Sequence, residues 1–134
     1  MAIAQGHAEE HERFEIQDHV QEGRHTLVLR GELDMAVAED LERAIAGICS
    51  APTRGIALDL AKLSFIDSTG LRAVVRGSEL CREHGCEFAL IPGCAAVQRV
   101  FELTGLIDVL PFRRRIATDE TDPAARRGDT AARP

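Results

Sequence analysis

The sequence contains no tryptophan and no tyrosine, and it has only five phenylalanines among 134 residues. Tryptophan and tyrosine are common platforms on which single-stranded nucleic acid stacks its bases. The formal net charge is −6 and the pI is about 5.3, which does not favour the concentrated basic face that a phosphate backbone requires. We therefore expect a protein partner and no nucleic acid.

Motifs for catalysis and metal binding are missing as well. The sequence has no Gly-rich phosphate loop and no Gly-x-Ser-x-Gly elbow, which argues against a nucleotide-binding enzyme and a serine hydrolase. The cysteines form no Cys-x-x-Cys pair and have no histidine at ligand spacing, so we expect buried free thiols, no metal site and no cofactor. The four cysteines are Cys49, Cys81, Cys86 and Cys94.

Long apolar runs are also absent. Residues 1–6 are followed by histidine and glutamate instead of an apolar core, which is not typical of a secretory signal. No apolar stretch is long enough to span a bilayer. We expect a cytoplasmic protein without membrane insertion.

The length suits one domain with loose ends. Residues 1–13 are polar and predict a flexible N-terminal arm. From Arg113 onward there is almost no bulky apolar residue, so burial cannot offset the entropy cost of ordering. We therefore predict a folded domain at residues 14–112 and a disordered tail at residues 113–134.

Strand and helix patterns alternate within this domain. Two apolar runs separated by a Gln-Glu-Gly turn predict an N-terminal hairpin, and two later runs predict interior strands. Helical crossovers between strands return the chain in the same direction, which indicates a mostly parallel sheet beyond the hairpin. The predicted strands lie near residues 14–20, 26–30, 56–60 and 87–91, with a short edge strand at 109–110.

Three helices are predicted from apolar residues at helical spacing. The first begins with Asp34 as its cap and stops before Pro52, and the second begins at Ser68 and stops before Gly85. The third follows Pro92-Gly93 and stops at Gly105. The order of elements predicts an α/β fold.

The turn at residues 67–70 opens directly into the second predicted helix. Ser68 stands at the helix start, where a serine hydroxyl ordinarily acts as the N-cap. A phosphate at this position would meet free backbone N–H groups and the positive end of the helix dipole. Ser68 is therefore predicted to be a capping residue or, alternatively, a site where the fold tolerates a covalent anion.

From Phe14 to about Phe112 the sequence resembles the STAS family, the domain of anti-sigma factor antagonists. The resemblance implies a STAS-like α/β fold, a small mixed sheet with an N-terminal hairpin and then mostly parallel strands, with about three to four helices on both sides. It rests on Gly31-Glu32-Leu33-Asp34, on Asp59-Leu60 through Phe65-Ile66-Asp67-Ser68-Thr69-Gly70-Leu71, and on Val97 through Gly105-Leu106.

The resemblance also implies a function. An anti-sigma factor antagonist of this type binds, when unphosphorylated, an anti-sigma factor that is also a GHKL-type ATP-binding serine kinase, and thereby frees the sigma factor. Phosphorylation of Ser68 would abolish this binding, and a serine phosphatase would restore it. Catalysis by the protein itself is not expected.

Seven residues near the turn form the predicted partner-binding set. Several have an ordinary structural explanation too: a helix cap for Asp34, a turn residue for Asp67, relief of crowding for Gly70 and a solvated side chain for Arg72. The set is Asp34, Asp67, Ser68, Thr69, Gly70, Leu71 and Arg72.

Two other functions stay open at this point. A STAS domain without a switch would be a docking subunit of a lipid-transport or signalling complex. A receiver-like phosphotransfer domain would use Asp59 near the end of a central strand, together with an acidic pair and a lysine. Asp18 is alone and Lys62 is misplaced for that chemistry.

Overall fold

The computed structural model describes residues 13–113, so the predicted arm and tail lie almost entirely outside the described residues. Its elements follow the predicted order of strands and helices. They are β1 (Glu15–Gln21), β2 (Arg24–Leu33), α2 (Ala38–Cys49), β3 (Gly55–Ile66), α3 (Ser68–Glu83), β4 (Glu87–Ile91), α4 (Ala95–Leu103) and the 3₁₀ helix η1 (Leu106–Asp108).

One mixed sheet with strand order β1-β2-β3-β4 forms the centre of the fold. β1 and β2 pair antiparallel around a tight turn, in which Glu22 and Gly23 both have positive φ. β2 pairs with β3, and β3 with β4, in parallel. The predicted α/β fold with a small mixed sheet is therefore confirmed.

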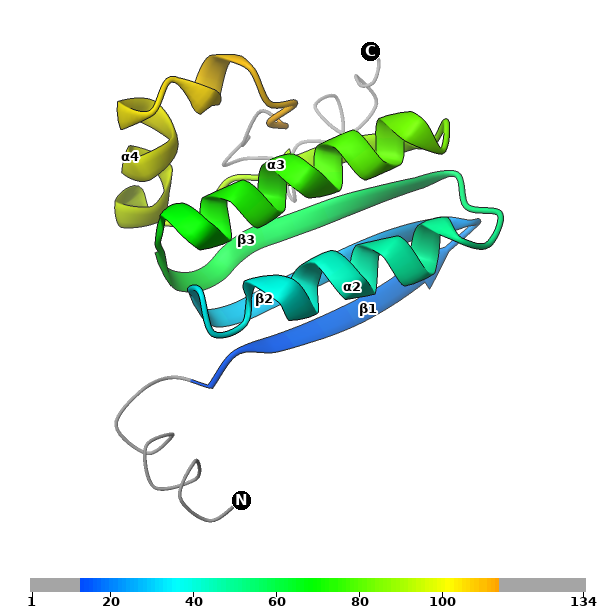
Figure 1. Ribbon diagram of the computed structural model, residues 1–134, viewed down its shortest axis with the longest axis horizontal. Helices are drawn as coiled ribbons and strands as arrows, with labels where there is room; N and C mark the ends of the chain where they lie inside the picture. The colour runs from blue at the N-terminus through cyan, green and yellow to red at the C-terminus, as the bar shows by residue number, and fades with distance from the viewer. Residues whose placement is uncertain (1–12, 114–134) are drawn as a thin grey trace, which may run out of the picture.

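Side chains alternate between the two faces of this sheet. Leu27, Leu29 and Leu33 of β2 are buried on one face, and α2 and α3 lie side by side across it (Figure 1). α2 adds Leu41 and Ile45 to the same core. Burial of this apolar surface is the main force that holds the two helices on the sheet.

The opposite face of β2 carries mainly polar side chains, with the half-buried Val28 among them. Arg24 and Arg30 alternate with the buried leucines and are exposed, and Thr26 is half-buried. Within the described part of the chain, no helix covers this side of β1 and β2 (Figure 1). The expectation of helices on both sides was wrong over these two strands, because a polar face needs no cover.

The fourth strand is flanked by the last part of the described chain. α4 ends before Gly105, which has φ +81°, as predicted. The predicted edge strand at 109–110 was wrong: η1 precedes these residues, and the contact with the sheet is a single parallel bridge between Leu90 and Phe112. Phe112 packs edge-to-face on Phe101 of α4, with ring centroids 4.9 Å apart.

The four cysteines fall into different environments. Cys49 and Cys81 are buried as expected, and Cys86 is half-buried. Cys94 is exposed, so the prediction of a buried thiol was wrong there. Burial raises the pKa of the Cys49 and Cys81 thiols, and the neighbouring thiols contribute to the shift. Both thiols are therefore protonated at neutral pH.

None of the helices described between residues 13 and 113 is both long enough and apolar enough to cross a membrane.

Candidate functional site

The predicted site lies where β2 and β3 end and α3 begins. Asp67, and not Ser68, is the N-cap of α3, because its backbone is extended and its carboxylate accepts a hydrogen bond from the N–H of Gly70 at 2.8 Å. Ser68 is the first helical residue. The prediction of Ser68 as the capping residue was therefore wrong by one position, and its hydroxyl has no capping role to perform.

Asp67 also joins two segments that are far apart in the sequence. Its second carboxylate oxygen accepts a hydrogen bond from the N–H of Met35 at 3.1 Å, and its own N–H donates to the carbonyl of Leu33 at 3.2 Å. The carboxylate thus bonds backbone groups on both sides of the site. Asp67 fixes the turn after β2 against the start of α3.

Asp34 lies in the turn after β2, at the same end of the sheet. Its side chain accepts a hydrogen bond from the N–H of Ala36, and its carbonyl accepts from the N–H groups of Val37 and Ala38. The N-cap of α2 is Val37, so the prediction that Asp34 caps this helix was wrong. Asp34 instead shapes the turn that holds Met35 beside Asp67.

Ser68 is exposed, and within residues 13–113 its hydroxyl has no hydrogen-bond partner. The N–H groups of Ser68 and Thr69 belong to the first turn of α3, where no intrahelical carbonyl reaches them. The positive end of the α3 dipole lies at the same place. The hydroxyl is therefore accessible and stands in an environment that favours a negative charge.

Two members of the predicted set lie beneath this surface. Gly70 is buried, and a Cβ atom there would lie 2.2 Å from the carbonyl oxygen of Leu33. Leu71 is only 6% exposed and belongs to the hydrophobic core. Gly70 and Leu71 therefore hold the start of α3 tightly against β2 and are not available for contact.

The remaining members face outward or partly outward. Thr69 and Asp67 are half-buried, and Arg72 is exposed one helical turn after Ser68. Residues four apart on a helix are neighbours on its surface. The Arg72 guanidinium is therefore on the same side of α3 as the Ser68 hydroxyl.

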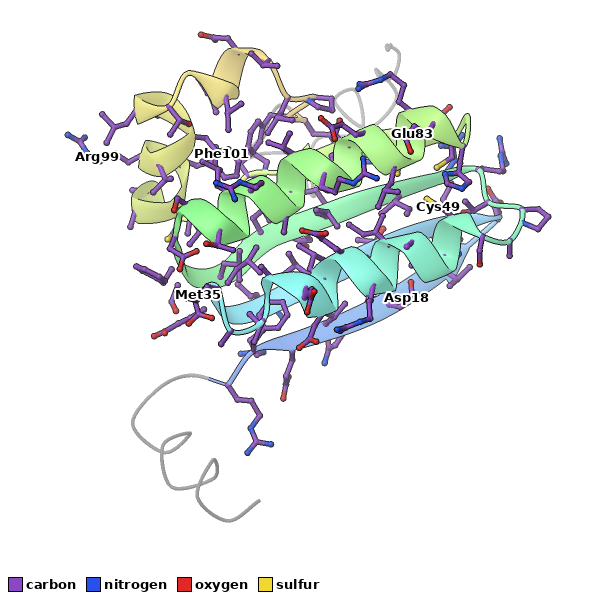
Figure 2. All side chains as sticks on the ribbon, in the orientation of Figure 1. Asp18, Met35, Cys49, Glu83, Arg99 and Phe101 are labelled. Atoms are coloured by element: carbon purple, nitrogen blue, oxygen red, sulfur yellow. The ribbon has the colours of Figure 1, made fainter. Side chains whose placement is uncertain are left out.

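Sequence reasoning missed two apolar side chains beside this site. Met35 is 72% exposed and Phe65 is 47% exposed. Met35 follows Asp34 in the turn held by Asp67, and it lies at the end of the molecule opposite Cys49 (Figure 2). The break in alternation at Ser64-Phe65 was the available signal, since an apolar residue next to a buried Ile66 must face away from the core.

We name this end the Ser68 surface. It combines an accessible hydroxyl and exposed apolar side chains with charged groups of both signs, as protein-binding surfaces commonly do. Its members are Asp34, Met35, Phe65, Asp67, Ser68, Thr69 and Arg72.

The residues needed for a receiver-like site are not brought together. Asp59 pairs with Val28 of β2, whereas Asp18 pairs with Leu27, so the two carboxylates point to opposite faces of the sheet. Asp18 contacts His25 at 3.0 Å, and Asp59 accepts a hydrogen bond from the N–H of Ala61. Asp18 and Asp59 therefore do not form the acidic pair that this alternative requires.

Comparison with known proteins gives consistent matches. The family model described as STAS domain matches residues 15–119. The anti-sigma-B factor antagonist of Staphylococcus aureus is 31% identical over 80 residues, which are 60% of this chain and 74% of that protein. The family-model match covers the described elements from β1 onward.

Two solved structures are also similar. An anti-sigma factor antagonist from Mycobacterium paratuberculosis has a TM-score of 0.69 at 25% identity, and the likeness covers 91% of this chain and 96% of the other. The Bacillus cell fate determinant SpoIIAA in its phosphorylated form has a TM-score of 0.59 at 21% identity, covering 77% and 93%. The second likeness is one of fold alone.

Proposed function

The chain belongs to the STAS domain family, and from this membership we propose that it is an anti-sigma factor antagonist that binds its anti-sigma factor through the Ser68 surface. The similar proteins from Staphylococcus aureus and Mycobacterium paratuberculosis both carry this description. In this proposal the chain binds its partner and catalyses no reaction.

The observation that carries the proposal is the position of Ser68. Its hydroxyl is exposed at the first helical residue of α3, because Asp67 takes over the capping bond. Met35 and Phe65 supply exposed apolar area at the same end of the sheet. A partner that covers this end of the molecule would contact these two side chains together with the hydroxyl or any group attached to it.

Phosphorylation of Ser68 would change binding to the partner and leave the folded structure unchanged. A phosphate carries roughly −1.5 to −2 charges at neutral pH. The first-turn N–H groups, the helix dipole and the Arg72 guanidinium all lie where they can offset part of that charge. No buried group has to move, since Ser68 is exposed before modification.

The partner would lose affinity for two reasons. A phosphate enclosed by an apolar interface costs several kcal/mol unless the partner supplies compensating cations. The phosphate would also add negative charge near Asp34 and Asp67, which repels any acidic group of the partner. Phosphorylation should therefore release the antagonist from its partner.

The proposal names the class of partner. The anti-sigma factor would carry a GHKL-type serine kinase domain that transfers phosphate from ATP to Ser68, and a serine phosphatase would remove it. Binding of the unmodified antagonist would free the sigma factor. We place this exchange in the cytoplasm, because sigma factors act there on RNA polymerase.

A phosphorylation assay tests the switch. Incubation with the anti-sigma kinase of the same organism and ATP should add one phosphate to the chain, as measured by intact-protein mass spectrometry. Ser68→Ala should prevent the addition, whereas the matched control Thr69→Ala should retain it. Phosphate on the Ser68→Ala variant would contradict the assignment of the acceptor. No transfer, with a stable complex to a transporter subunit, would favour the docking alternative.

A binding assay tests the surface. Ser68→Asp should fold normally and bind the anti-sigma factor at least about tenfold more weakly than Ser68→Ala, because the carboxylate introduces a charge into the interface. Met35→Ala and Phe65→Ala should also weaken binding in calorimetric titrations. Leu103→Ala serves as a control, since Leu103 is a comparably exposed apolar residue on α4. Equal affinities for all of these variants would rule out the Ser68 surface as the contact.

A further inference from the structure

Three cysteine thiols converge at the end of the molecule opposite the Ser68 surface. The Sγ atom of Cys49 lies 4.0 Å from that of Cys81 and 3.9 Å from that of Cys86. All three sulfur atoms lie within 4.8 Å of one another. Figure 2 shows Cys49 at this end, near the last turn of α3.

The end of α3 brings two of these cysteines together. Cys86 donates its N–H to the carbonyl of Cys81 at 2.9 Å, and Gly85 donates to the carbonyl of Arg82 at 3.1 Å. These two bonds, with Gly85 at φ +72°, form a Schellman motif, which commonly places the side chain after the glycine against the last helical turn. The turn at the end of α3 therefore brings Cys86 back toward Cys81, five residues earlier in the sequence.

The packing of α2 on α3 supplies the third thiol. Cys49 is the last residue of α2 and is buried between the two helices and the sheet. Its separation from Cys81 in the sequence is 32 residues, so no local spacing pattern reveals the group. This is why the sequence predicted separate free thiols and no metal site.

The spacing of the sulfur atoms suits a shared ligand. A metal–sulfur bond of about 2.3 Å places sulfur atoms about 3.8 Å apart in tetrahedral geometry and about 4.0 Å apart in trigonal geometry. The separations of 3.9 and 4.0 Å from Cys49 fall within this range, and the sulfur atoms of Cys81 and Cys86 lie within 4.8 Å of each other. A disulfide requires sulfur atoms about 2.05 Å apart, so these thiols are not arranged as a disulfide.

The surroundings favour a cation. Cys49 and Cys81 stand at the C-terminal ends of α2 and α3, where each helix dipole contributes partial negative charge. Cys86 is only half-buried, which leaves a route from solvent to the group. Thiolate ligands select thiophilic ions such as Zn²⁺ and Cu⁺ over Mg²⁺ and Ca²⁺.

We propose that Cys49, Cys81 and Cys86 together bind one thiophilic metal ion, Zn²⁺ or Cu⁺. Binding exchanges the thiol protons for the metal ion, so protons pass to solvent as metal–sulfur bonds form. The ion joins the ends of α2 and α3 to the segment that leads into β4. Within residues 13–113, no further histidine, cysteine or carboxylate belongs to the group, so Zn²⁺ takes water as its fourth ligand and Cu⁺ is held by sulfur alone.

Metal titration of the full chain tests the proposal. The reduced protein, freed of metal with a chelator, is titrated anaerobically with Zn²⁺ or with Cu⁺ in separate experiments against a chromophoric chelator. We expect one ion per chain in native mass spectrometry, release of protons into weakly buffered solution, and a higher thermal unfolding midpoint. Competition with the chelator gives the affinity of the chain for each ion.

Cysteine variants locate the site. Cys86→Ser, at the half-buried position, should bind the metal more than about tenfold more weakly, and Cys49→Ser provides a second variant should the first fail to fold. Cys94→Ser is the matched control, because Cys94 is a free cysteine outside the group, and it should bind as the unaltered chain does. Circular dichroism confirms that each variant is folded.

Three results would overturn the proposal. The first is absence of a retained ion for both metals, and the second is unchanged affinity in Cys86→Ser and Cys49→Ser. The third is loss of two hydrogens by mass spectrometry in air, with no metal bound by the reduced chain, which would make the group a redox pair instead.

Discussion

At the scale of single residues, Asp67 and Gly70 decide how the Ser68 hydroxyl is presented. Asp67 accepts the capping hydrogen bond from the N–H of Gly70, which leaves Ser68 free at the first helical position. Gly70 lets the helix approach the carbonyl of Leu33, which no residue with a Cβ atom can do without a shift. The exposure of the Ser68 hydroxyl therefore depends on Asp67, which caps α3, and on Gly70, which allows α3 to pack closely on β2.

The close approach at Gly70 gives a prediction about stability. Gly70→Ala should lower the free energy of unfolding by about 2 kcal/mol or more, because the new methyl group collides with backbone and overpacked sites typically cost 1–3 kcal/mol. Urea-induced unfolding measures the change.

Gly47 provides the matched control for this substitution. It lies inside α2, and a Cβ atom there has nothing within 4 Å. Gly47→Ala should stabilise the protein by roughly 0.5–1 kcal/mol, since alanine has the higher helix propensity. A Gly70→Ala variant as stable as Gly47→Ala would show that the close contact of α3 with the Leu33 carbonyl is not required for stability.

At the scale of elements, the last described segment, residues 111–113, hydrogen-bonds to β4. The N–H of Leu90 donates to the carbonyl of Pro111, and the N–H of Arg113 donates to the carbonyl of Leu90. Phe112, between them, packs on Phe101 of α4. This segment thus couples β4 to α4 although no edge strand forms.

The aromatic contact predicts a measurable loss. Phe112→Ala should destabilise the protein by about 2 kcal/mol, which is less than the 3–5 kcal/mol of a fully buried phenylalanine because Phe112 is half-buried. Leu103→Ala, at a position 74% exposed, should change stability by less than about 0.5 kcal/mol. Thermal unfolding of both variants compares them, and equal midpoints would mean that α4 is held without Phe112.

The strands are also linked by charge at their starts. Arg24 begins β2 and Glu87 begins β4, and they pair across Gly55 of β3. The hydrogen bond from Arg24 holds the pKa of the Glu87 carboxyl below its usual range. A carboxyl with a lowered pKa in the folded state stabilises the protein above its unfolded pKa, and this contribution is lost as the pH falls through the folded pKa.

Arg24→Ala should therefore raise the pKa of Glu87 toward its ordinary value, as measured by NMR titration. The effect on unfolding should be small, because both side chains are exposed and the pair is screened by solvent. Arg43→Ala is the control, since Arg43 pairs with Glu39 and Asp40 on α2 and leaves Glu87 untouched. An unchanged pKa of Glu87 in Arg24→Ala would exclude this pairing in solution.

At the scale of the whole molecule, the two candidate sites lie at opposite ends of α3. Ser68 and Cys81 are 13 residues apart on this helix, which corresponds to about 20 Å at a rise of 1.5 Å per residue. Met35 and Cys49 mark the two ends in Figure 2. The partner surface and the cysteine group therefore share a helix and have no side chains in common.

This separation predicts additive effects on stability. In metal-free buffer, the changes in unfolding free energy for Ser68→Asp and Cys86→Ser should sum to that of the double variant within about 0.5 kcal/mol. Denaturant unfolding of the four proteins in a double-mutant cycle measures the sum. A larger difference would mean that α3 transmits strain between its ends.

The sequence alone determined the order of elements and indicated the candidate site. Apolar periodicity and turn residues act locally, so they predicted the hairpin, the three helices and the stop at Gly105, and the family pattern placed Ser68 at a helix start. The tertiary structure decided which neighbouring side chain caps α3, which residues lie beneath the surface, and that Met35 and Phe65 are exposed. It also brought Cys49 to Cys81 across 32 residues of sequence and to Cys86 across 37 residues. Contacts of this kind depend on how helices pack on a sheet, which no local pattern of residues records.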